Sequence, residues 1–286
     1  MSNCLLAYPD RALTGTISGG SWTGLDRLQD DARGSLAQSA DLSLASTQFT
    51  INLSAATDLK ILAILDHNAS MTAQIRVRIG NDNTFAENLF DSNWQPFWLA
   101  HYPQGGLPWG HPALWAGGPM PAEDYDAFPK CRYFVISDGY SISAQYVLVE
   151  INDAANPAGY FSLSRCILAP AWSPPINMEY GAQGGWDASL TNVTKSKGGV
   201  KFFEVNPKFR ICNFTLDTTE AVGTAWLMEI QRKIGLDQEL FFIFNPDDAT
   251  MLEQSRSFLA TMKALSAIEF PFFDRNTHAF QLEEKL

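Results

Sequence analysis

The sequence lacks any uninterrupted apolar run of about 18 residues, the length that a membrane-spanning helix requires. The first ten residues also lack a basic start and carry only a short apolar stretch, which argues against a secretory signal peptide. We therefore expect synthesis in the cytoplasm and no membrane-spanning segment. Charged residues are scarce at 18%, whereas apolar residues make up 46%, so the chain can bury sizeable cores and is not disordered.

Basic residues are fewer than acidic ones, with 20 Lys and Arg against 31 Asp and Glu. The formal net charge is −11, which argues against a surface that follows the phosphates of a nucleic acid. The four cysteines, Cys4, Cys131, Cys166 and Cys212, show no CxxC spacing. This scatter predicts neither a zinc site nor a disulfide framework, and reduced, partly buried thiols are the simplest interpretation.

Short strands separated by turn residues dominate the chain up to about residue 169. Gln48–Leu53 and Ala73–Ile79 alternate apolar and polar residues, the period-two pattern of a half-buried strand. Leu59–Leu65 is more uniformly apolar, as in a strand covered on both faces. Further strands are expected at Arg132–Ile136, Gln145–Ile151 and Tyr160–Leu168. Many strands with almost no helical periodicity predict an antiparallel sandwich or barrel.

A domain boundary is expected after Trp172, which separates residues 1–172 from residues 173–286. A Pro-rich segment lies at this point, and the following residues 181–199 are rich in Gly, Ser and Asn, as is common at a domain boundary. The second domain has strands at Lys208–Leu216, Glu239–Phe244, Ser257–Leu265 and Ala279–Glu284. The pattern of this half predicts a sheet with one helix laid across it.

That helix is expected over Thr218–Ile234. Asp217 and Glu220 have the spacing of a capping box at its start. Gly235 follows its end, where a left-handed cap is common. An apolar stripe at every fourth residue predicts its buried face; its members are Val222, Trp226, Ile230 and Ile234.

Motifs for catalysis or cofactor binding are absent. The sequence has no GxGxxG, GxxxxGK[ST], GxSxG or HExxH pattern, so no catalytic residue and no cofactor are expected. The four histidines, His67, His101, His111 and His278, are far apart, and no metal site is predicted.

Three short polar segments have two interpretations each. Asp66–Asn68 follows an apolar strand and could be a catalytic or ligand-binding triplet, but a turn with local side-chain hydrogen bonds is favoured. Asn81–Asn83 resembles half of a calcium loop, yet the glycine and distal glutamate of an EF-hand are missing. Asp247 and Asp248 follow Asn-Pro, which is typical of a turn. No segment places the paired carboxylates of a glycosidase, although sequence leaves that possibility open.

Aromatic residues gather between Asn88 and Pro129, where strand periodicity fails. Exposed rings there could stack on sugars, with five aromatics as candidates: Trp94, Trp98, Tyr102, Trp109 and Trp115. The favoured alternative is that these rings bury against the sandwich or against a neighbouring subunit, because protein interfaces are enriched in the same residues.

Blocks along nearly the whole chain resemble a family of phage tail proteins. The first half resembles a discoidin-type, galactose-binding-like jelly roll of such proteins, through Tyr8–Arg11, Ser18–Trp22, Leu28–Asp30, Ser39–Asp41, Ser46–Phe49, Leu65–Asn68 and Glu150–Tyr160. The second half resembles the end of the same proteins, through Glu229–Gly235, Phe242–Asp248 and Ile268–Phe273. The strand-helix-strands order of the second half is also similar to tail-tube and distal-tail modules, which is an analogy of fold alone.

The resemblance implies a mainly β, non-enzymatic structural protein of the distal tail or baseplate of long-tailed phages and prophages of Proteobacteria. It implies a location at the virion tail tip and tail-tube, baseplate-hub and tape-measure proteins as partners. A homo-oligomeric ring, with six copies by analogy with tail tubes, would join tail tube to tip. Such an interface is expected to bury apolar strips and unpaired strand edges.

Two other functions remain as alternatives. The jelly-roll resemblance and the aromatic loop together suggest a carbohydrate-binding module that helps the phage hold a host surface glycan. A tail-associated depolymerase is the third hypothesis, although the sequence presents no catalytic motif for it.

Overall fold

The computed structural model describes residues 3–100, 102, 106, 108–110, 125, 129–137, 139–219, 221–247, 251–272 and 275–286. The chain forms two compact units. We call Ala7–Trp172 with Pro246–Ser255 the sandwich unit, and Met1–Leu6 with Ser173–Asn245 and Arg256–Leu286 the sheet-and-helix unit. The expected division after Trp172 therefore needs two corrections. The first six residues and the segment at 246–255 each belong to the unit opposite to the one expected.

The first layer of the sandwich unit is an antiparallel sheet. Its strand order is β2-β5-β11-β7-β8, and β9 also pairs with β7. The bounds are β2 Thr16–Ser18, β5 Phe49–Leu59, β7 Gln74–Gly80, β8 Phe90–Asp91, β9 Gln95–Pro96 and β11 Ile142–Asn152. The predicted alternation in β7 is confirmed, because Ile75, Val77 and Ile79 are fully buried while the arginines between them are partly exposed.

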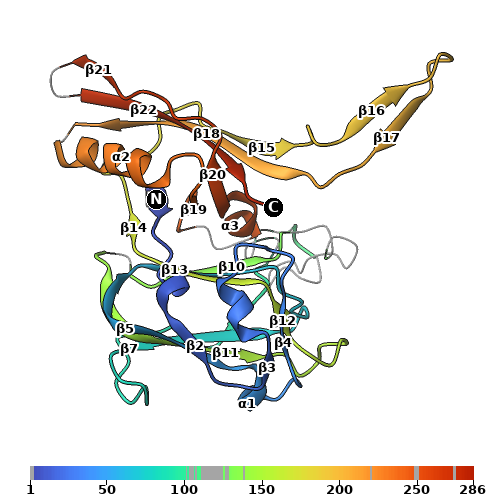
Figure 1. Ribbon diagram of the computed structural model, residues 1–286, viewed down its shortest axis with the longest axis vertical. Helices are drawn as coiled ribbons and strands as arrows, with labels where there is room; N and C mark the ends of the chain where they lie inside the picture. Colours follow the sequence, from blue (N-terminus) through green and yellow to red (C-terminus); the bar gives the residue numbers. More distant parts are fainter. Residues whose placement is uncertain are drawn as a thin grey trace. The chain divides into compact units, whose positions relative to one another are not determined.

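The second layer is a three-stranded sheet, β10-β6-β13, with a smaller sheet β12-β4-β3 beside it. The bounds are β3 Trp22–Thr23, β4 Ala37–Ser39, β6 Ile61–Leu65, β10 Cys131–Val135, β12 Ser162–Leu163 and β13 Arg165–Ala169. All five residues of the central strand β6 are buried, as its uniformly apolar sequence predicted. Figure 1 shows the two layers facing each other.

The core of the sandwich unit lies between these layers. Ile51, Val77 and Val149 of the first layer and Leu62 and Phe134 of the second belong to one hydrophobic cluster. A fully buried side chain of this size stabilises the fold by roughly 1.5–3 kcal/mol. Short helices and one short strand complete this part of the chain: 3₁₀ helices Ala12–Thr14 and Leu25–Gln29, α1 Leu44–Thr47, α3 Met251–Arg256 and β14 Ala171–Trp172.

The sheet-and-helix unit has a sheet in the order β1-β19-β20-β22-β18-β15, with β21 paired to β22. Its bounds are β1 Leu5–Ala7, β15 Gln183–Asp187, β18 Phe209–Thr218, β19 Glu239–Ile243, β20 Phe258–Met262, β21 Glu269–Phe272 and β22 Arg275–Glu284. The aromatic rings of Phe214, Phe242 and Phe280 stack in its core, with centroids 5.3 and 5.2 Å apart. This is the predicted sheet with one packed helix.

That helix, α2, spans Ala221–Ile234 and buries Leu227, Ile230 and Ile234. Its end is confirmed: Gly235 has φ 57° and donates its N–H to the carbonyl of Gln231 at 3.0 Å. Its predicted start is wrong, because Asp217 lies within β18 and cannot cap the helix. Among the described residues, no helix is long and apolar enough to cross a bilayer.

The Gly-, Ser- and Asn-rich residues 181–199 form strands and turns. β15 pairs with β18, and β16, Asn192–Lys195, pairs with β17, Lys201–Glu204, to form a hairpin that continues beyond β15 and β18 (Figure 1). Gly198 and Gly199 lie in the turn of this hairpin, whereas Gly184 and Gly185 lie within β15.

Candidate functional site

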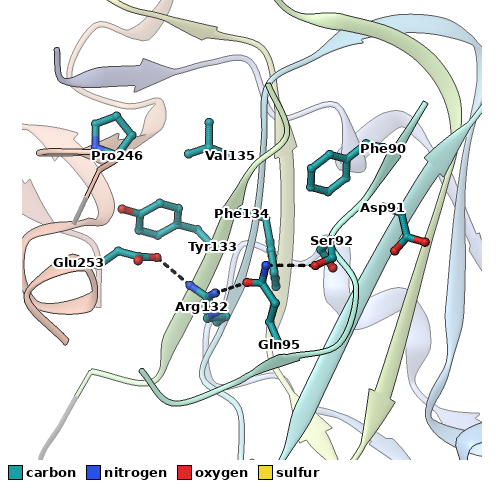
Figure 2. Close-up of a pocket in the computed structure, with 10 residues that line it drawn as sticks. All are labelled: Phe90, Asp91, Ser92, Gln95, Arg132, Tyr133, Phe134, Val135, Pro246 and Glu253. Carbon is teal, nitrogen blue, oxygen red and sulfur yellow. Dashed lines mark hydrogen bonds and ion pairs between the residues drawn. The ribbon is translucent and has the colours of Figure 1, made fainter. Parts of the chain in front are cut away.

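A polar cavity of about 330 Å³ opens on the sandwich unit at the edge where β8, β9 and β10 come together (Figure 2). Its volume lies at the small end of the range of ligand pockets. Aromatic, carboxylate, amide, hydroxyl and guanidinium groups surround it: Phe90, Asp91, Ser92, Gln95, Arg132, Tyr133, Phe134, Val135, Pro246 and Glu253.

An interruption of the outer strand shapes one wall. β8 pairs with the end of β7 through Ile79 and Phe90, whereas β9 pairs with its beginning through Ile75 and Gln95. Between them Asn93 takes φ 54°, a left-handed conformation that asparagine tolerates better than most residues. The chain bends at Asn93. Phe90 and Gln95 therefore pair with opposite ends of β7, and both line the cavity.

Arg132 connects the other walls. One terminal nitrogen donates to Glu253 Oε1 at 2.7 Å, and the other donates to Gln95 Oε1 at 2.9 Å. Gln95 in turn donates to the carbonyl of Ser92 at 3.1 Å. Figure 2 shows this chain of interactions from α3 across β10 to β9. The side chains of Arg132 and Glu253 are only 6% and 10% exposed, so the ion pair is shielded from water.

The guanidinium of Arg132 is not fully satisfied by these bonds. Its carbon lies 4.7 Å from the ring centroid of Phe134, within the range of a cation-π contact. Its Nε is buried and has no hydrogen-bond partner among the described residues. A buried donor without a partner costs stability.

The second carboxylate of the cavity is also held by an arginine. Arg76 donates from Nε and a terminal nitrogen to the two oxygens of Asp91, at 2.9 and 2.5 Å. The hydrogen bonds from Arg76 lower the pKa of Asp91 below its ordinary value, despite opposing desolvation. Both carboxylates of the cavity therefore have a cationic partner, and the site offers hydrogen-bonding groups with little net charge.

This arrangement suits binding better than acid-base hydrolysis. A glycosidase needs one carboxyl group that keeps its proton until it reaches the glycosidic oxygen. The hydrogen bonds from Arg76 favour the ionised form of Asp91 over the protonated one. The carboxylate of Glu253 is engaged in its ion pair with Arg132. Aromatic rings beside groups that both donate and accept hydrogen bonds fit a ligand with apolar faces and many hydroxyls.

Sequence reasoning missed the ion pair of this cavity, although Phe90, Asp91, Ser92 and Gln95 lie within the aromatic-rich segment 88–129. Arg132 was assigned only to an apolar strand, and Glu253 lies 121 residues further along the chain in a short helix that no periodicity predicted. The usable signal was Arg132 itself, since an arginine at the start of an apolar strand requires a partner when it is buried.

The five aromatics predicted as a ligand or interface group do not form one described surface. Trp98 follows the favoured alternative of burial and not the sugar-stacking one: it is 5% exposed, and its indole N–H donates to the carbonyl of Ala69 at 3.0 Å. The ring packs against His67 and Tyr125, with centroids 5.2 and 5.1 Å away. The ring of Trp98 is thus part of the core and cannot stack on a ligand.

The other candidate aromatics have different surroundings. Trp94 is 37% exposed and lies between Ser92 and Gln95, which line the cavity. Tyr102 and Trp109 are 46% and 86% exposed, and Trp115 lies outside the described residues. Exposure of these rings is compatible with a role in binding, but Trp94 is the one that adjoins cavity residues along the chain.

Asp66–Asn68 performs the structural role that was favoured. Arg33 forms a two-pronged ion pair with Asp66, at 2.7 and 2.6 Å, and Ser164 donates to the same carboxylate. Asn68 accepts from the backbone of Ser162 at 2.8 Å and donates to the carbonyl of Tyr160. These bonds tie together distant segments of the sandwich, a wider role than the local turn that was expected.

His67 is enclosed in the same region. It is 1% exposed, and its ring centroid lies 4.8 Å from that of Phe97. Burial lowers its pKa to about 3, and the charge of Lys130 adds to this effect. Its Nδ1 accepts the N–H of Ala69 at 3.3 Å, and its Nε2 has no partner in the described part of the chain. The ring is therefore neutral in the folded protein.

The remaining polar candidates are turns and buried thiols. Asp82 accepts from the backbone of Thr84 at 3.2 Å, and Asp247 is an exposed turn residue, whereas Asp248 lies outside the described residues. The described residues contain no group of three His, Cys, Asp or Glu side chains able to hold a metal. All four cysteines are free and buried, and desolvation raises the pKa of Cys4 to about 12.

No protein-family model matches the chain, and no curated protein matches it. Among solved structures, similar ones include the lectin domain of Lectinolysin complexed with Lewis B antigen, at 12% identity and TM-score 0.34, covering 57% of this chain and 96% of that one. A fucose binding module of Streptococcus pneumoniae, SpX-3, has 12% identity and TM-score 0.34, covering 56% and 97%. Chitosan-binding module 1 of a chitosanase/glucanase from Paenibacillus sp. IK-5 has 15% identity and TM-score 0.33, covering 56% and 98%. Likeness at these identities and TM-scores assigns neither a ligand nor a binding residue to this chain.

Proposed function

We propose that the sandwich unit is a carbohydrate-binding module and that the cavity beside β10 holds one end of a neutral glycan. The observation that carries the proposal is the composition of the cavity, where the ion-paired Arg132 and Glu253 lie among aromatic rings and an amide. Because each charge already has a counter-charge, the cavity favours a hydroxyl-rich neutral ligand over a phosphate or carboxylate. The protein acts by binding and performs no catalysis.

The test is calorimetric titration of the full chain with fucose, galactose, chitosan oligosaccharides and neutral host surface polysaccharide. We expect saturable binding of at least one neutral sugar. Phe90→Ala removes a partly exposed ring from the cavity wall and should weaken that binding by about 1 kcal/mol, roughly fivefold. Leu89→Ala is the matched control, because Leu89 is the 49% exposed neighbour of Phe90 and does not line the cavity.

Two results would contradict the proposal. One is the absence of binding to every neutral sugar by the unaltered protein. The other is equal weakening by Phe90→Ala and Leu89→Ala, which would locate any binding outside the cavity. Release of reducing sugar from host envelope preparations would instead support the depolymerase hypothesis.

A second candidate function concerns the sheet-and-helix unit, which we propose to be an assembly module of a phage tail tip. The observation that favours it is the exposed hairpin β16-β17, which carries large apolar side chains with no partner in the described part of the chain. In this role the protein would be a virion component at the distal tail, with tail-tube, baseplate-hub and tape-measure proteins as neighbours and copies of itself in a ring.

Mass spectrometry of purified tails tests this role. Recovery of the protein in stoichiometric amounts from mature particles would support it, and negative-stain images of the purified protein would show whether rings form. Its absence from mature particles would rule out a structural role in the virion and leave the glycan-binding proposal unaffected.

A further inference from the structure

The hairpin at residues 188–206, which we call the arm, is a two-stranded ribbon attached to the edge of a sheet. β15 ends at Asp187 and β18 begins at Phe209, and these two residues pair directly at the base of the arm. These hydrogen bonds of the arm join residues of the arm to one another or to its base. Asn206 donates to the carbonyl of Leu190 at 2.8 Å, and Ser189 donates to Asp187. A ribbon of this kind is only marginally stable without a surface to pack on.

The arm nevertheless carries large apolar side chains. Val193 is 52% exposed, Phe202 and Phe203 are each 60% exposed, and Val205 is 76% exposed. Among the described residues, no other segment covers either face of the ribbon, because all residues of β16 and β17 are exposed. Apolar groups concentrated in so small an element mark an interaction surface.

One face of the arm combines Val193 and Phe203 with positive charge, whereas Phe202 lies on the opposite face with its pairing partner Thr194. Val193 pairs with Phe203, and two residues nearer the tip Lys195 pairs directly with Lys201, so all four side chains share a face. Like charges directly opposite each other destabilise a ribbon. Lys197 adds a third positive charge in the turn. This face therefore fits a partner that offers apolar contact and negative charge.

The charge of the whole chain indicates which partner this is. The arm contains Lys195, Lys197, Lys201 and Glu204, which gives it a formal charge of +2. Since the protein carries −11, all residues outside the arm together carry −13. Two arms would repel each other, whereas one arm and the acidic body of a second copy attract each other. The favoured contact is thus between unlike surfaces of two copies.

We propose that the arm docks onto the body of a second copy of this chain and is the element through which the protein self-associates. The contact is head-to-tail, because the arm of one copy meets a different surface of the next, and such contacts close into rings or continue as filaments. The proposal rests on the assembly role proposed above for the sheet-and-helix unit and makes no use of the glycan cavity.

The structure permits a clean removal of the arm. Because Asp187 and Phe209 are paired, residues 188–208 can be replaced by Asn-Gly, which forms a two-residue turn between antiparallel strands. β15 and β18 then remain joined as an ordinary hairpin. A second variant, Lys195→Glu with Lys201→Glu, keeps the arm and reverses the charge of its tip. The matched control is Lys263→Glu, compared with the single reversal Lys195→Glu, because both lysines are exposed and the net charge changes equally.

Sedimentation velocity of each protein, from about 1 µM to about 100 µM, measures the association. We expect the unaltered chain and the control to self-associate, the arm-less chain to stay monomeric, and the charge reversal to weaken association roughly tenfold or more. Higher salt should weaken it as well. A monomeric unaltered chain across this range, or arm-less protein that associates as strongly, would overturn the proposal. Arm-dependent binding to phosphatidylglycerol vesicles by a monomer would do so too. Absence of the protein from purified tails would refute the tail role without changing these results.

Discussion

His67 should make the stability of the sandwich unit depend on pH between about 7 and 5. Its folded-state pKa is about 3, against 6.5 for an exposed histidine, because the ring is buried. A depressed folded pKa means that the unfolded chain takes up a proton first as the pH falls. The contribution of His67 is therefore fully present above pH 6.5 and is lost progressively towards pH 3.

The size of the effect follows from the two pKa values. Between pH 7.5 and pH 5 the unfolded state gains about 2 kcal/mol from protonation of His67, while the folded state gains almost nothing. Asp10 opposes this trend, since burial raises its pKa to about 6 and its protonation then favours the folded state. The two groups partly cancel in the intact protein, so a difference between variants is required to isolate His67.

His67→Asn provides that difference, because the Asn oxygen can replace Nδ1 as acceptor for the N–H of Ala69. Free energies of unfolding come from urea titrations followed by hydrogen-exchange mass spectrometry of peptides from β7 and β11. The stability advantage of the unaltered chain over the variant should shrink by about 2 kcal/mol from pH 7.5 to pH 5. Phe161→Leu, a core change without a titrating group, should show a pH-independent difference. A flat difference for His67→Asn, or a His67 pKa near 6.5 by NMR, would refute this account of the buried ring.

Three further changes test other parts of the structure. Glu253→Gln leaves Arg132 buried without its counter-charge and should destabilise the sandwich unit by about 3–5 kcal/mol, whereas replacing both residues by apolar ones should cost less, as a double-mutant cycle would measure. Gly235→Ala forces a left-handed alanine at φ 57° and should lower stability by about 1–2 kcal/mol in a urea titration. The cysteines should react with a thiol reagent only upon unfolding, because burial raises the pKa of Cys4 and Cys212 to about 12 and about 11; rapid reaction of the folded protein would contradict this.

Local patterns predicted most strands of five or more residues and one end of α2, but not the short strands. The alternation of β7 and the apolar run of β6 are properties of a few neighbouring residues, and burial followed them. The start of α2 was misjudged because strand pairing overrode a capping signal. β18 continues through Thr218, where Asp217 pairs with Thr277 and accepts from Arg275 instead of capping a helix. Whether Asp217 caps a helix or extends a strand depends on its pairing with β22, about 60 residues away. The local sequence therefore does not predict it.

The cavity could not be predicted for the same reason. Its chemistry depends on Arg132 meeting both Gln95 and Glu253, and neither partner stands at a spacing that a motif would reveal. The aromatic cluster pointed to residues 88–129, which include the cavity residues Phe90, Asp91, Ser92 and Gln95. Composition alone cannot separate Trp98, which fills the core, from Trp94, which lies at the surface. Burial is a property of the assembled fold.

The path of the chain separates the two proposed activities. The sheet-and-helix unit begins with β1, and the chain then forms Ala7–Trp172 of the sandwich unit. After returning to the sheet-and-helix unit, the chain leaves it once more between β19 and β20, where Pro246–Ser255 joins the sandwich unit. This second excursion brings Glu253 to Arg132. The cavity thus requires contacts closed over 121 residues, so it is completed only when most of the chain has folded. The arm is a local hairpin that needs only its own residues and its paired base. Changes in the cavity should therefore leave self-association intact, and excision of the arm should leave glycan binding intact. If one variant abolished both, a single shared surface would have to replace the two separate ones.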